Sequence, residues 1–454
     1  MSGISRRKIL GGMAAGLVFP AMADTDGDPD YANFARNLNK IDATMTDVPS
    51  ATIRDGRVIQ PERELPVFHT TDVVVVGGGP AGFAAAVAAA RTGAKVALVE
   101  RYGSLGGLFT NGMVLIILAT VVNENGGQTL YTAGLCKEFM DRLQMLGPDA
   151  ITKFTPERYG QPTADPEASK YLMDEMVREA GVEMFFHSWG VDVIQTGDAL
   201  KGVVFESKQG RQAILAKQVV DCTGDGDLNF LAGGGYQQIT HALGFVYQVA
   251  NVDRVDRDKD PEAAKKIYAR GNQPIKSMCW RNCLGNRGNG LDVRQLSKAE
   301  MEHRKGAWEL VQRQKKTPGF EKIYVSSTCS QLGVRASRLL KGVKSISKND
   351  AKTGLRVDDA IGYSGDDRSG FKQGFGIPYG CLVPEKVDNL LVAGRCVSCA
   401  PDLIDRLRLI GPCFVTGHAA GVAAALAARN GCAPRNLAVA DIRKELKNQG
   451  AYLG

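Results

Sequence analysis

Three glycines give this sequence its clearest chemical signature. Gly77, Gly79 and Gly82 form a GxGxxG turn. The first glycine allows a tight turn, the second lets the backbone approach a pyrophosphate, and the third lets a helix pack closely on the preceding strand. Glu100 follows roughly twenty residues later, where a carboxylate binds a ribose 2′-OH and disfavours a 2′-phosphate. These residues predict a dinucleotide site for NAD or FAD, and NADP fits them poorly.

The elements expected around these residues fit the same site. Residues 73–76 form a short β-branched apolar run, typical of a central parallel strand. The alanine-rich residues 83–91 predict a helix whose N-terminal amides and dipole favour a bound anion. Residues 95–99 predict a second strand that carries Glu100 at its carboxyl end. A lone glycine motif could be a turn in any α/β protein, but the complete order favours the dinucleotide site.

Length and composition limit the classes of protein. With 454 residues the chain is too long for one ordinary core, and we expect two connected domains. The net charge of +7 comes without a basic cluster interleaved with aromatic residues, so we expect no nucleic-acid partner. Beyond the N-terminal segment no apolar run is long enough to span a bilayer, so we expect no membrane span in the mature chain. The 10 cysteines are scattered, and no cluster has convincing metal-site spacing.

The N-terminus has the three parts of a secretory signal. Arg6 and Arg7 precede a short apolar run at residues 11–19, and residues 21–23 form an AxA-like cleavage site. The arginine pair indicates the twin-arginine type. A disordered basic N-terminus is the alternative, but the order of the three parts favours the signal. We expect cleavage after Ala23 and a periplasmic protein.

Strands that end in small-residue turns return twice along the chain. Residues 218–222 predict a buried strand that runs into a turn at residues 223–227, and residues 389–393 predict another strand ahead of a glycine- and alanine-rich helix at 411–429. Such turns at the carboxyl ends of parallel strands are where open sheets bind ligands. The cofactor domain is therefore expected to assemble from separated segments.

We predict an α/β fold in which a Rossmann-like FAD-binding domain carries an inserted mixed α/β substrate domain. The substrate domain should contain charged helices at residues 259–269 and 297–315. The predicted parts are a signal peptide at 1–23, an N-terminal arm at 24–70, the cofactor domain at 71–112 with 166–235 and 376–440, the substrate domain at 113–165 with 236–375, and a C-terminal tail at 441–454.

Five sequence blocks between residues 72 and 428 carry a resemblance to a known family. The blocks are DVVVVGGGPAG, ERYGSLGG, VVDCTGDGDL, QLGVRASRLLKG, and IPYGCLVPEKVDNLLVAGRCVS with TGHAAGVAAA. In this order they resemble FAD-dependent oxidoreductases of the glutathione-reductase structural class, in the branch that shares distant features with succinate dehydrogenase and heterodisulfide-reductase-like flavoproteins. The resemblance implies that the cofactor is FAD and not NAD.

The resemblance also assigns cofactor-binding residues. It implies a helix near Pro412 whose N-terminus faces the flavin, and it places His418 where the family commonly has glutamine. His418 would either donate to the flavin C2 carbonyl or be a hydrogen-bonded helix residue. The other residues implied to bind the cofactor are Gly77, Gly79, Pro80, Ala81 and Gly82 at the pyrophosphate, Glu100 at the ribose, Arg101, Gly106 and Gly107 along the cofactor, Thr223, Gly224 and Asp225 at the nucleotide half, and Gly394 and Arg395 at the phosphates and ribityl chain.

Hydride transfer from an alcohol or amine needs a base near the flavin. His241 is the candidate base, and its alternative is a structural hydrogen-bonded histidine. Arg335 and Arg338 match family arginines that would clamp a carboxylate or polarise a carbonyl, or else form ion pairs between domains. Arg408 also matches a family position. These four residues are the candidate catalytic set.

The cysteines suggest two further hypotheses. Cys396 and Cys399 would suit a redox disulfide, but the glycine-rich block after Glu100 lacks the cysteine pair of disulfide reductases. Cys279 and Cys283 would pair in an oxidising periplasm.

The combined interpretation is a periplasmic FAD-dependent dehydrogenase. It would transfer hydride from a small organic substrate to flavin N5 and pass electrons to a quinone, a cytochrome or oxygen. One alternative is a flavin-dependent reductase of an activated double bond. Another is a non-catalytic subunit that relays electrons or only binds FAD.

Overall fold

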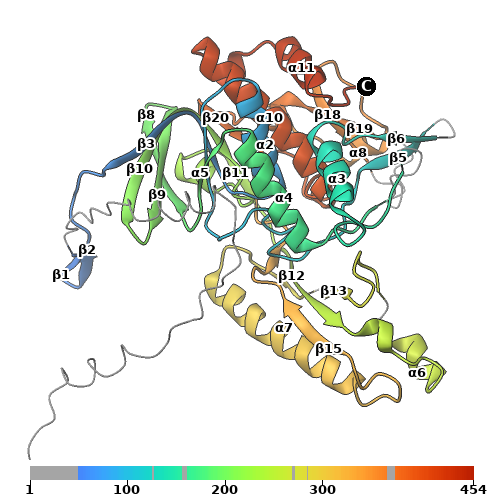
Figure 1. Cartoon of the computed structure of the whole chain (residues 1–454). Helices are drawn as coiled ribbons and strands as arrows, with labels where there is room; N and C mark the ends of the chain where they lie inside the picture. The colour runs from blue at the N-terminus through green and yellow to red at the C-terminus, as the bar shows by residue number, and fades with distance from the viewer. Residues whose placement is uncertain (1–49, 125–126, 156–160, 268–270, 284, 366–373) are drawn as a thin grey trace, which may run out of the picture. The chain divides into compact units, whose positions relative to one another are not determined.

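The computed structural model describes residues 50–454, apart from 125–126, 156–160, 268–270, 284 and 366–373 (Figure 1). The chain divides into two compact units, residues 1–62 and residues 63–454. The predicted signal peptide and residues 24–49 of the predicted arm lie outside the described residues.

The described part of the first unit is a short antiparallel hairpin. It consists of β1 (Thr52–Arg54) and β2 (Arg57–Ile59). The two turn residues, Asp55 and Gly56, have φ of 52° and 73°. Two positive φ values are what a type I′ hairpin turn requires, which explains the Asp-Gly pair.

A seven-stranded sheet forms the centre of the second unit. Its strands are β3 (Val67–Val76), β4 (Val96–Val99), β7 (Glu183–Phe185), β8 (Trp189–Thr196), β9 (Ala199–Ser207), β10 (Gly210–Asp221) and β20 (Leu390–Val392). The order is β7-β4-β3-β10-β9-β8, and β20 also pairs with β10. β3 runs parallel to β4 and β10, and its last four residues, Val73 to Val76, are buried. Parallel strands joined through helices confirm the predicted α/β fold.

Two helices of small residues pack against each other beside this sheet. α2 (Pro80–Arg91) follows the glycine turn, and α10 (Ile410–Asn430) comes from the far end of the chain. A Cβ at Gly417 would lie 2.0 Å from the Ala81 oxygen, and one at Gly421 would lie 2.1 Å from the Ala85 oxygen. The glycines thus let the helices approach closely, which brings the start of α10 beside the glycine turn. Within the described ranges α10 is the one helix long and apolar enough to cross a membrane, and it is almost entirely buried inside the protein, as in a core helix.

A second core is built around β12 (His241–Ala250). This strand pairs antiparallel with β13 (Cys279–Cys283), β14 (Arg287–Gly288), β15 (Tyr324–Thr328) and β16 (Gly333–Val334). The long helix α7 (Val293–Gln314) packs against β12 and β15 through buried Ala307 and Val311. The sequence predicts this helix at 297–315, and it begins one turn earlier because Asp292 caps it.

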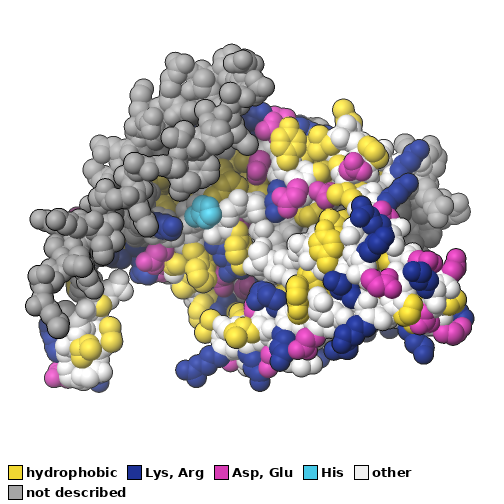
Figure 2. Space-filling view, turned by 60° about the horizontal axis from the view of Figure 1, so that its bottom comes forward, with side chains coloured by type: hydrophobic (Ala, Val, Ile, Leu, Met, Phe, Trp, Pro, Cys, Tyr) yellow, Lys and Arg dark blue, Asp and Glu magenta, His cyan; other side chains and the backbone are white. Residues whose placement is uncertain are grey.

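The outer face of α7 carries paired opposite charges. Arg304 contacts Glu300 at 2.9 Å, and Lys298 and Lys305 face Glu302 and Glu309. In Figure 2, which brings the bottom of Figure 1 forward, positive and negative side chains are interspersed and not grouped by sign.

The remaining elements complete the second unit. They are β5 (Val121–Glu124), β6 (Gly127–Leu130), α3 (Leu135–Leu146), α4 (Pro166–Glu179), α5 (Asp227–Leu231), β11 (Tyr236–Gln238), η2 (Val252–Arg254), α6 (Pro261–Lys266), β17 (Arg338–Leu340), α8 (Lys348–Lys352), β18 (Ala360–Ser364), β19 (Phe375–Pro378), η4 (Tyr379–Cys381), α9 (Ile404–Leu407), η5 (Pro434–Asn436) and α11 (Val439–Asn448). The domain bounds given above remain predictions.

Candidate active site

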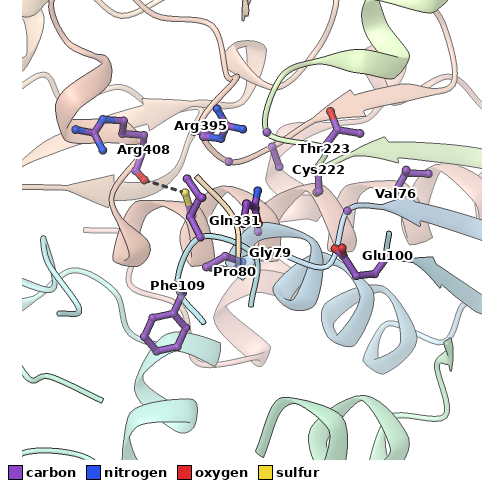
Figure 3. Close-up of a pocket in the computed structure, with 18 of the residues that line it drawn as sticks. Val76, Gly79, Pro80, Glu100, Phe109, Cys222, Thr223, Gln331, Arg395 and Arg408 are labelled. Carbon is purple, nitrogen blue, oxygen red and sulfur yellow. Dashed lines mark hydrogen bonds between the residues drawn. The ribbon is translucent and has the colours of Figure 1, made fainter. Parts of the chain in front are cut away.

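A cavity of about 1120 Å³, open to solvent, lies at the carboxyl ends of β3, β4, β10 and β20 (Figure 3). In open parallel sheets this edge is where ligands bind. Figure 3 places Glu100 and Arg408 at opposite ends of the labelled residues. The predicted cofactor residues that line the cavity are Gly77, Gly79, Pro80, Ala81, Glu100, Arg101, Gly107, Thr223, Gly224, Gly394 and Arg395.

Each glycine of the GxGxxG turn is required for a different reason. Gly77 has φ of +99°, and a Cβ there would lie 2.3 Å from the carbonyl oxygen of Cys222. A Cβ at Gly82 would lie 1.7 Å from the Gly77 oxygen, so this glycine permits close packing and does not line the cavity. A Cβ at Gly79 would meet nothing within 4 Å. The open space above Gly79 is the cradle expected for a pyrophosphate.

Glu100 is held at one end of the cavity by backbone amides. Its Oε2 accepts from the Gly78 N–H at 2.6 Å, and its Oε1 accepts from the Tyr102 N–H at 2.8 Å. Burial raises the pKa of Glu100 against these bonds and the Arg101 charge, which lower it. The Arg101 guanidinium lies 4.9 Å from the Tyr102 ring centre and 5.6 Å from that of Trp189. Since these three residues line the cavity, its Glu100 end has an aromatic and cationic wall.

Arg395 places a buried cation beside the glycine cradle. Its Nη2 donates to Asp225 Oδ2 at 2.8 Å, while the other oxygen of Asp225 accepts from the Ser337 hydroxyl. Burial lowers the pKa of Arg395, but the charge of Asp225 and their hydrogen bond outweigh burial and raise it overall. Arg395 is 9% exposed, and its Nη1 is buried with no partner in the described part of the chain. A donor in this position, together with the space at Gly79, fits the anionic pyrophosphate of a dinucleotide.

Three other predicted cofactor residues lie behind the cavity wall. Asp225 acts on the cavity through Arg395. Gly106 donates its N–H to the Gly78 oxygen at 2.7 Å, which holds the second glycine stretch against the first. His418 fits the second alternative, a hydrogen-bonded helix residue, and it lies two turns inside α10, about 12 Å from the start of the helix. Its Nε2 lies 3.0 Å from Gln449 Oε1, and burial lowers its pKa to about 4. A neutral His418 thus joins α10 to the residue that follows α11.

The N-terminus of α10 opens onto the cavity. The helix begins at Ile410, slightly before the predicted start near Pro412, and no side chain caps it. Leu409, Ile410 and Cys413 line the cavity. The Gly411 N–H donates to the Leu118 oxygen at 3.3 Å. The positive end of the helix dipole, which no side chain caps, therefore acts on this side of the site.

Two of the four predicted catalytic residues contact the same carboxylate. Asp405 Oδ1 lies 3.2 Å from His241 Nε2, and it accepts from Arg408 Nε at 2.8 Å and Nη2 at 2.5 Å. The Nδ1 atom of His241 accepts from the Ala242 N–H at 2.7 Å. Burial lowers the pKa of His241, outweighing Asp405, so its ring is neutral at pH 7. Arg408 lines the cavity and thereby connects it to this group.

The structure separates Arg335 from Arg338. Arg338 Nη1 lies 2.8 Å from Asp227 Oδ1, and the guanidinium lies 4.2 Å from the Phe230 ring centre. Arg338 therefore forms the ion-pair alternative and not the substrate clamp. The pKa of Arg335 is lowered, first by burial and then by the charge of Arg408, and Arg335 does not line the cavity.

Gln331 is a cavity residue that the sequence prediction missed. It lies in the loop before β16, so it brings the second core to the cavity wall. Its Oε1 is buried and finds no hydrogen-bond partner within the described ranges. Figure 3 shows it between Arg395 and Pro80. Its place at the start of the block QLGVRASR was a usable signal, whereas apolar lining residues such as Phe109 and Leu118 carried none.

The cysteines near the site are buried thiols. Burial raises the pKa of Cys399 and Cys413 to about 12 and that of Cys396 further, so none is a ready nucleophile. Cys396 and Cys399 are not bridged. The expected pairing of Cys279 with Cys283 conflicts with the extended backbone of β13. Four residues of strand set the two Cα atoms about 13 Å apart, whereas a disulfide allows about 7 Å. The side chain of Cys283 lies outside the described residues.

His303, on α7, packs its ring 6.3 Å from that of Phe245. In the part of the chain that the structure describes, no group of three or more His, Cys, Asp and Glu side chains is arranged to hold a metal ion.

Comparison with known proteins identifies the family. The profile described as FAD dependent oxidoreductase matches residues 72–446. Over 49 residues the chain is 55% identical to dihydrolipoyl dehydrogenase from Trypanosoma brucei brucei, covering 11% of this chain and 10% of that protein. It is 30% identical over 161 residues to thiamine thiazole synthase from Methanococcus vannielii, covering 34% of this chain and 56% of that one. The chain thus spans only part of the length of these relatives.

Among solved structures, p-nitrophenol 4-monooxygenase from Pseudomonas putida is 14% identical, with a TM-score of 0.44 and coverage of 83% of this chain and 84% of that one. A geranylgeranyl bacteriochlorophyll reductase-like protein from Thermoplasma acidophilum is also 14% identical, with a TM-score of 0.41 and coverage of 84% of both chains.

Proposed function

The chain belongs to the FAD dependent oxidoreductase family, and on that premise we propose that it is a dehydrogenase that removes hydride from a small organic substrate and passes the electrons to a quinone, a cytochrome or oxygen. The observation that supports this proposal is the make-up of the cavity. The lining holds the glycine cradle, Glu100 and Arg395, and Gln331 lies beside them. Arg408 lies far from Glu100 and contacts Asp405, which also contacts His241. A substrate would bind toward Arg408.

When bound, FAD supplies a hydride acceptor. The open backbone at Gly79 and the free N–H of Arg395 would hold the pyrophosphate, and Glu100 the ribose. The uncapped start of α10 would favour negative charge on the flavin side of the cavity. These contacts orient the cofactor and leave the opposite wall for the substrate.

His241 is the group proposed to take the substrate proton. Its pKa is lowered by burial, so the ring is neutral and can accept a proton at pH 7. Both ring nitrogens are engaged, by the Ala242 N–H and by Asp405. To act as a base, His241 must exchange one of these partners for the substrate. Asp405 would then stabilise the charged ring.

The same contacts favour a second candidate, reduction of an activated double bond. A histidine with both nitrogens engaged, next to Arg335 and Arg408, suits stabilisation of a developing enolate better than proton removal. The two candidates differ in the direction of hydride transfer.

Anaerobic spectroscopy on the purified full chain separates these candidates. Small alcohols, acids and amines are screened for bleaching of the oxidised flavin, and unsaturated acids for reoxidation of the photoreduced flavin. Bleaching supports the dehydrogenase, and reoxidation without bleaching supports the reductase. A protein that retains FAD but responds to neither panel would match the third hypothesis, an electron-relay subunit.

We also propose export by the twin-arginine route, on the basis of Arg6, Arg7 and the cleavage pattern ending at Ala23. N-terminal sequencing of the periplasmic fraction should give a chain that begins at Asp24, and replacing both arginines by lysine should retain the precursor in the cytoplasm. Recovery of an uncleaved protein with its first residues intact would contradict the proposal.

A further inference from the structure

A second cavity of about 920 Å³, open to solvent, lies at the C-terminal end of α10. Residues of β3, β9 and β10 line it, together with the end of α10 and the residues that follow the helix. It has no described lining residue in common with the cofactor cavity. Because α10 has 21 residues and a helix rises about 1.5 Å per residue, about 30 Å separate the two helix ends, one of which lines each cavity.

Gln218, on β10, gives this cavity an acceptor that lacks a donor. The residue lines the cavity and is 3% exposed. Its Nε2 donates to the Cys432 carbonyl oxygen at 3.0 Å, which fixes the orientation of the side-chain amide, because the reverse orientation would set two oxygens against each other. Its Oε1 is buried and has no hydrogen-bond partner among the described residues. Since a buried acceptor without a donor is unfavourable, this atom indicates a ligand that carries an N–H or O–H group.

The end of α10 adds to this preference for a donor. Gly431, with φ of +64°, ends the helix, and the Cys432 N–H donates to the Ala427 oxygen at 3.1 Å. The last carbonyl groups of a helix have no partner within it, and here Ala428 brings them to the cavity lining. The negative end of the helix dipole favours a cation at such a position. An ammonium group, which is both a cation and a donor, therefore fits this side of the cavity.

Lys201, on β9, adds a positive charge to the lining. It is exposed and makes no ion pair within the described ranges. Lys217, the other lysine of the lining, is already paired with Asp72 at 2.7 Å. A free lysine side chain offers N–H donors and a charge that suit a carboxylate. The lining thus suits a zwitterion, with its ammonium group toward Gln218 and its carboxylate toward Lys201.

Cys432 places a thiol in the same lining. Of the nine cysteines whose side chains the structure describes, eight are buried and Cys432 is partly exposed. A Cβ at the neighbouring Gly431 would meet nothing within 4 Å, so there is open space beside Cys432. Because the reactivity of a thiol depends on its exposure, a reagent in this cavity can reach Cys432 and not the buried thiols.

We propose that this cavity binds the disulfide of a zwitterionic amino-acid thiol and that Cys432 forms a mixed disulfide with it. Cys432 releases its proton to water, and the thiolate attacks one sulfur of the bound disulfide. The S–S bond of the ligand breaks, a new S–S bond to Cys432 forms, and the other half of the ligand leaves as a thiolate. The ligand is itself the oxidant, so no further reactant is needed. The reaction does not involve the flavin, so this site and the proposed function can fail separately.

Mass spectrometry of the FAD-loaded full chain tests the site with three related disulfides. Cystine carries ammonium and carboxylate groups, cystamine only ammonium groups, and dithiodipropionate only carboxylates. Adducts are measured on the intact protein and assigned by peptide mapping. Each rate is divided by the rate of the same reagent with free N-acetylcysteine, because the leaving thiols differ in reactivity.

We expect one adduct, on Cys432, and the highest relative rate for cystine. Equal relative rates for the three reagents would show an accessible thiol only and would overturn the proposal. A higher relative rate for either control reagent, or no adduct on Cys432, would overturn it as well.

Variants assign the parts of the site. Cys432→Ser should give no adduct. Lys201→Gln should slow the reaction with cystine by about 2- to 5-fold, the size of an exposed ion pair, and should not slow the reaction with cystamine. Lys208→Gln removes an exposed charge from the turn after β9, outside the cavity lining, and should react as the unmodified protein does.

Gln218→Leu removes the acceptor and keeps the size of the side chain. It should slow the reactions with cystine and cystamine by about 3- to 10-fold, the effect of one hydrogen bond, and leave that with dithiodipropionate unchanged, because this reagent has no donor. Faster reactions with all three reagents would mean that Gln218 only holds the end of α10 in place, and would contradict the proposal. FAD content and the unfolding midpoint show whether each variant folds. If Gln218→Leu does not fold, Lys201→Gln still decides, since an unchanged cystine rate in that variant rejects the site.

Discussion

The two ends of the cavity differ in how their residues are held. At the glycine end, the Cβ distances at Gly77 and Gly82 of 2.3 and 1.7 Å show that backbone touches backbone. At the Asp405 end, His241 and Arg408 are held by side-chain contacts of 2.5 to 3.2 Å on a carboxylate that is 51% exposed. The first end tolerates almost no change of residue, while the second can be altered one side chain at a time. Cofactor binding should therefore be rigid, and substrate choice adjustable.

The largest expected effect comes from filling the cradle. Gly79→Val adds a side chain where nothing lies within 4 Å, at an ordinary φ of −67°, so the apoprotein should fold. The new side chain occupies the pyrophosphate position, and FAD affinity should fall roughly 100-fold or more, about 2.7 kcal/mol. Gly82→Val meets backbone and should give no folded protein.

Fluorescence titration with FAD and thermal unfolding of the apoprotein distinguish these two glycines. Gly306→Ala, in open space inside α7, is the control: it should leave FAD affinity unchanged and raise the unfolding midpoint slightly, because alanine is favoured over glycine in a helix by about 1 kcal/mol. A Gly79→Val protein that retains FAD at full stoichiometry would show that the cofactor lies elsewhere.

The second effect concerns the buried ion pair at the same end. Asp225→Asn leaves Arg395 charged and 9% exposed, without its counter-ion. Removing one partner of a buried pair costs about 3–5 kcal/mol of the free energy of unfolding. Urea denaturation measures this loss. The half-exposed pair of Arg211 with Glu206 is the control, since Glu206→Gln should cost at most about 1 kcal/mol. Equal losses in the two variants would mean that burial does not set the strength of the Asp225 pair.

The third effect is a dependence of stability on pH. Burial raises the pKa of Asp221 from 3.8 to about 6, the charge of Asp227 adds to it, and hydrogen bonds from Thr223 and Asn229 oppose it. The folded state thus favours the protonated acid. Below pH 3.8 this preference adds about 3 kcal/mol to the free energy of unfolding. That stabilisation is lost as the pH rises through 6.

Urea midpoints between pH 4.5 and 7.5 test this slope. In Asp221→Asn the contribution is absent, so the variant should lose less stability than the unmodified protein as pH rises. Any cost of the asparagine itself is independent of pH. Parallel curves for the two proteins would assign the pH dependence to other groups.

The difference between the two ends of the cavity also explains which parts of the fold and of the site could be predicted from the sequence. The glycine turn, Glu100 and the strands around them follow local rules of spacing and burial, so the α/β fold and the cofactor residues near residue 100 were predictable. The roles of Arg335 and Arg338 were not, since they lie three residues apart and only the folded chain places Asp227 beside one and Arg408 near the other. Gln331 stands at the start of the same sequence block, which marked it as a candidate, but only the folded chain places it in the cavity wall.

The smallest effect separates packing from cofactor contact. His418 lies about 12 Å inside α10 and bonds Gln449, so His418→Gln should leave the flavin absorption spectrum unchanged. Loss of this single hydrogen bond should lower the free energy of unfolding by about 1 kcal/mol. Because burial lowers the pKa of His418 to about 4, the ring is neutral above pH 5 and the loss should not vary between pH 6 and 8. Absorption spectra and urea midpoints check both expectations. A shifted flavin spectrum would show that His418 belongs to the cofactor end of the cavity. The rigid glycine end would then include the first two turns of α10.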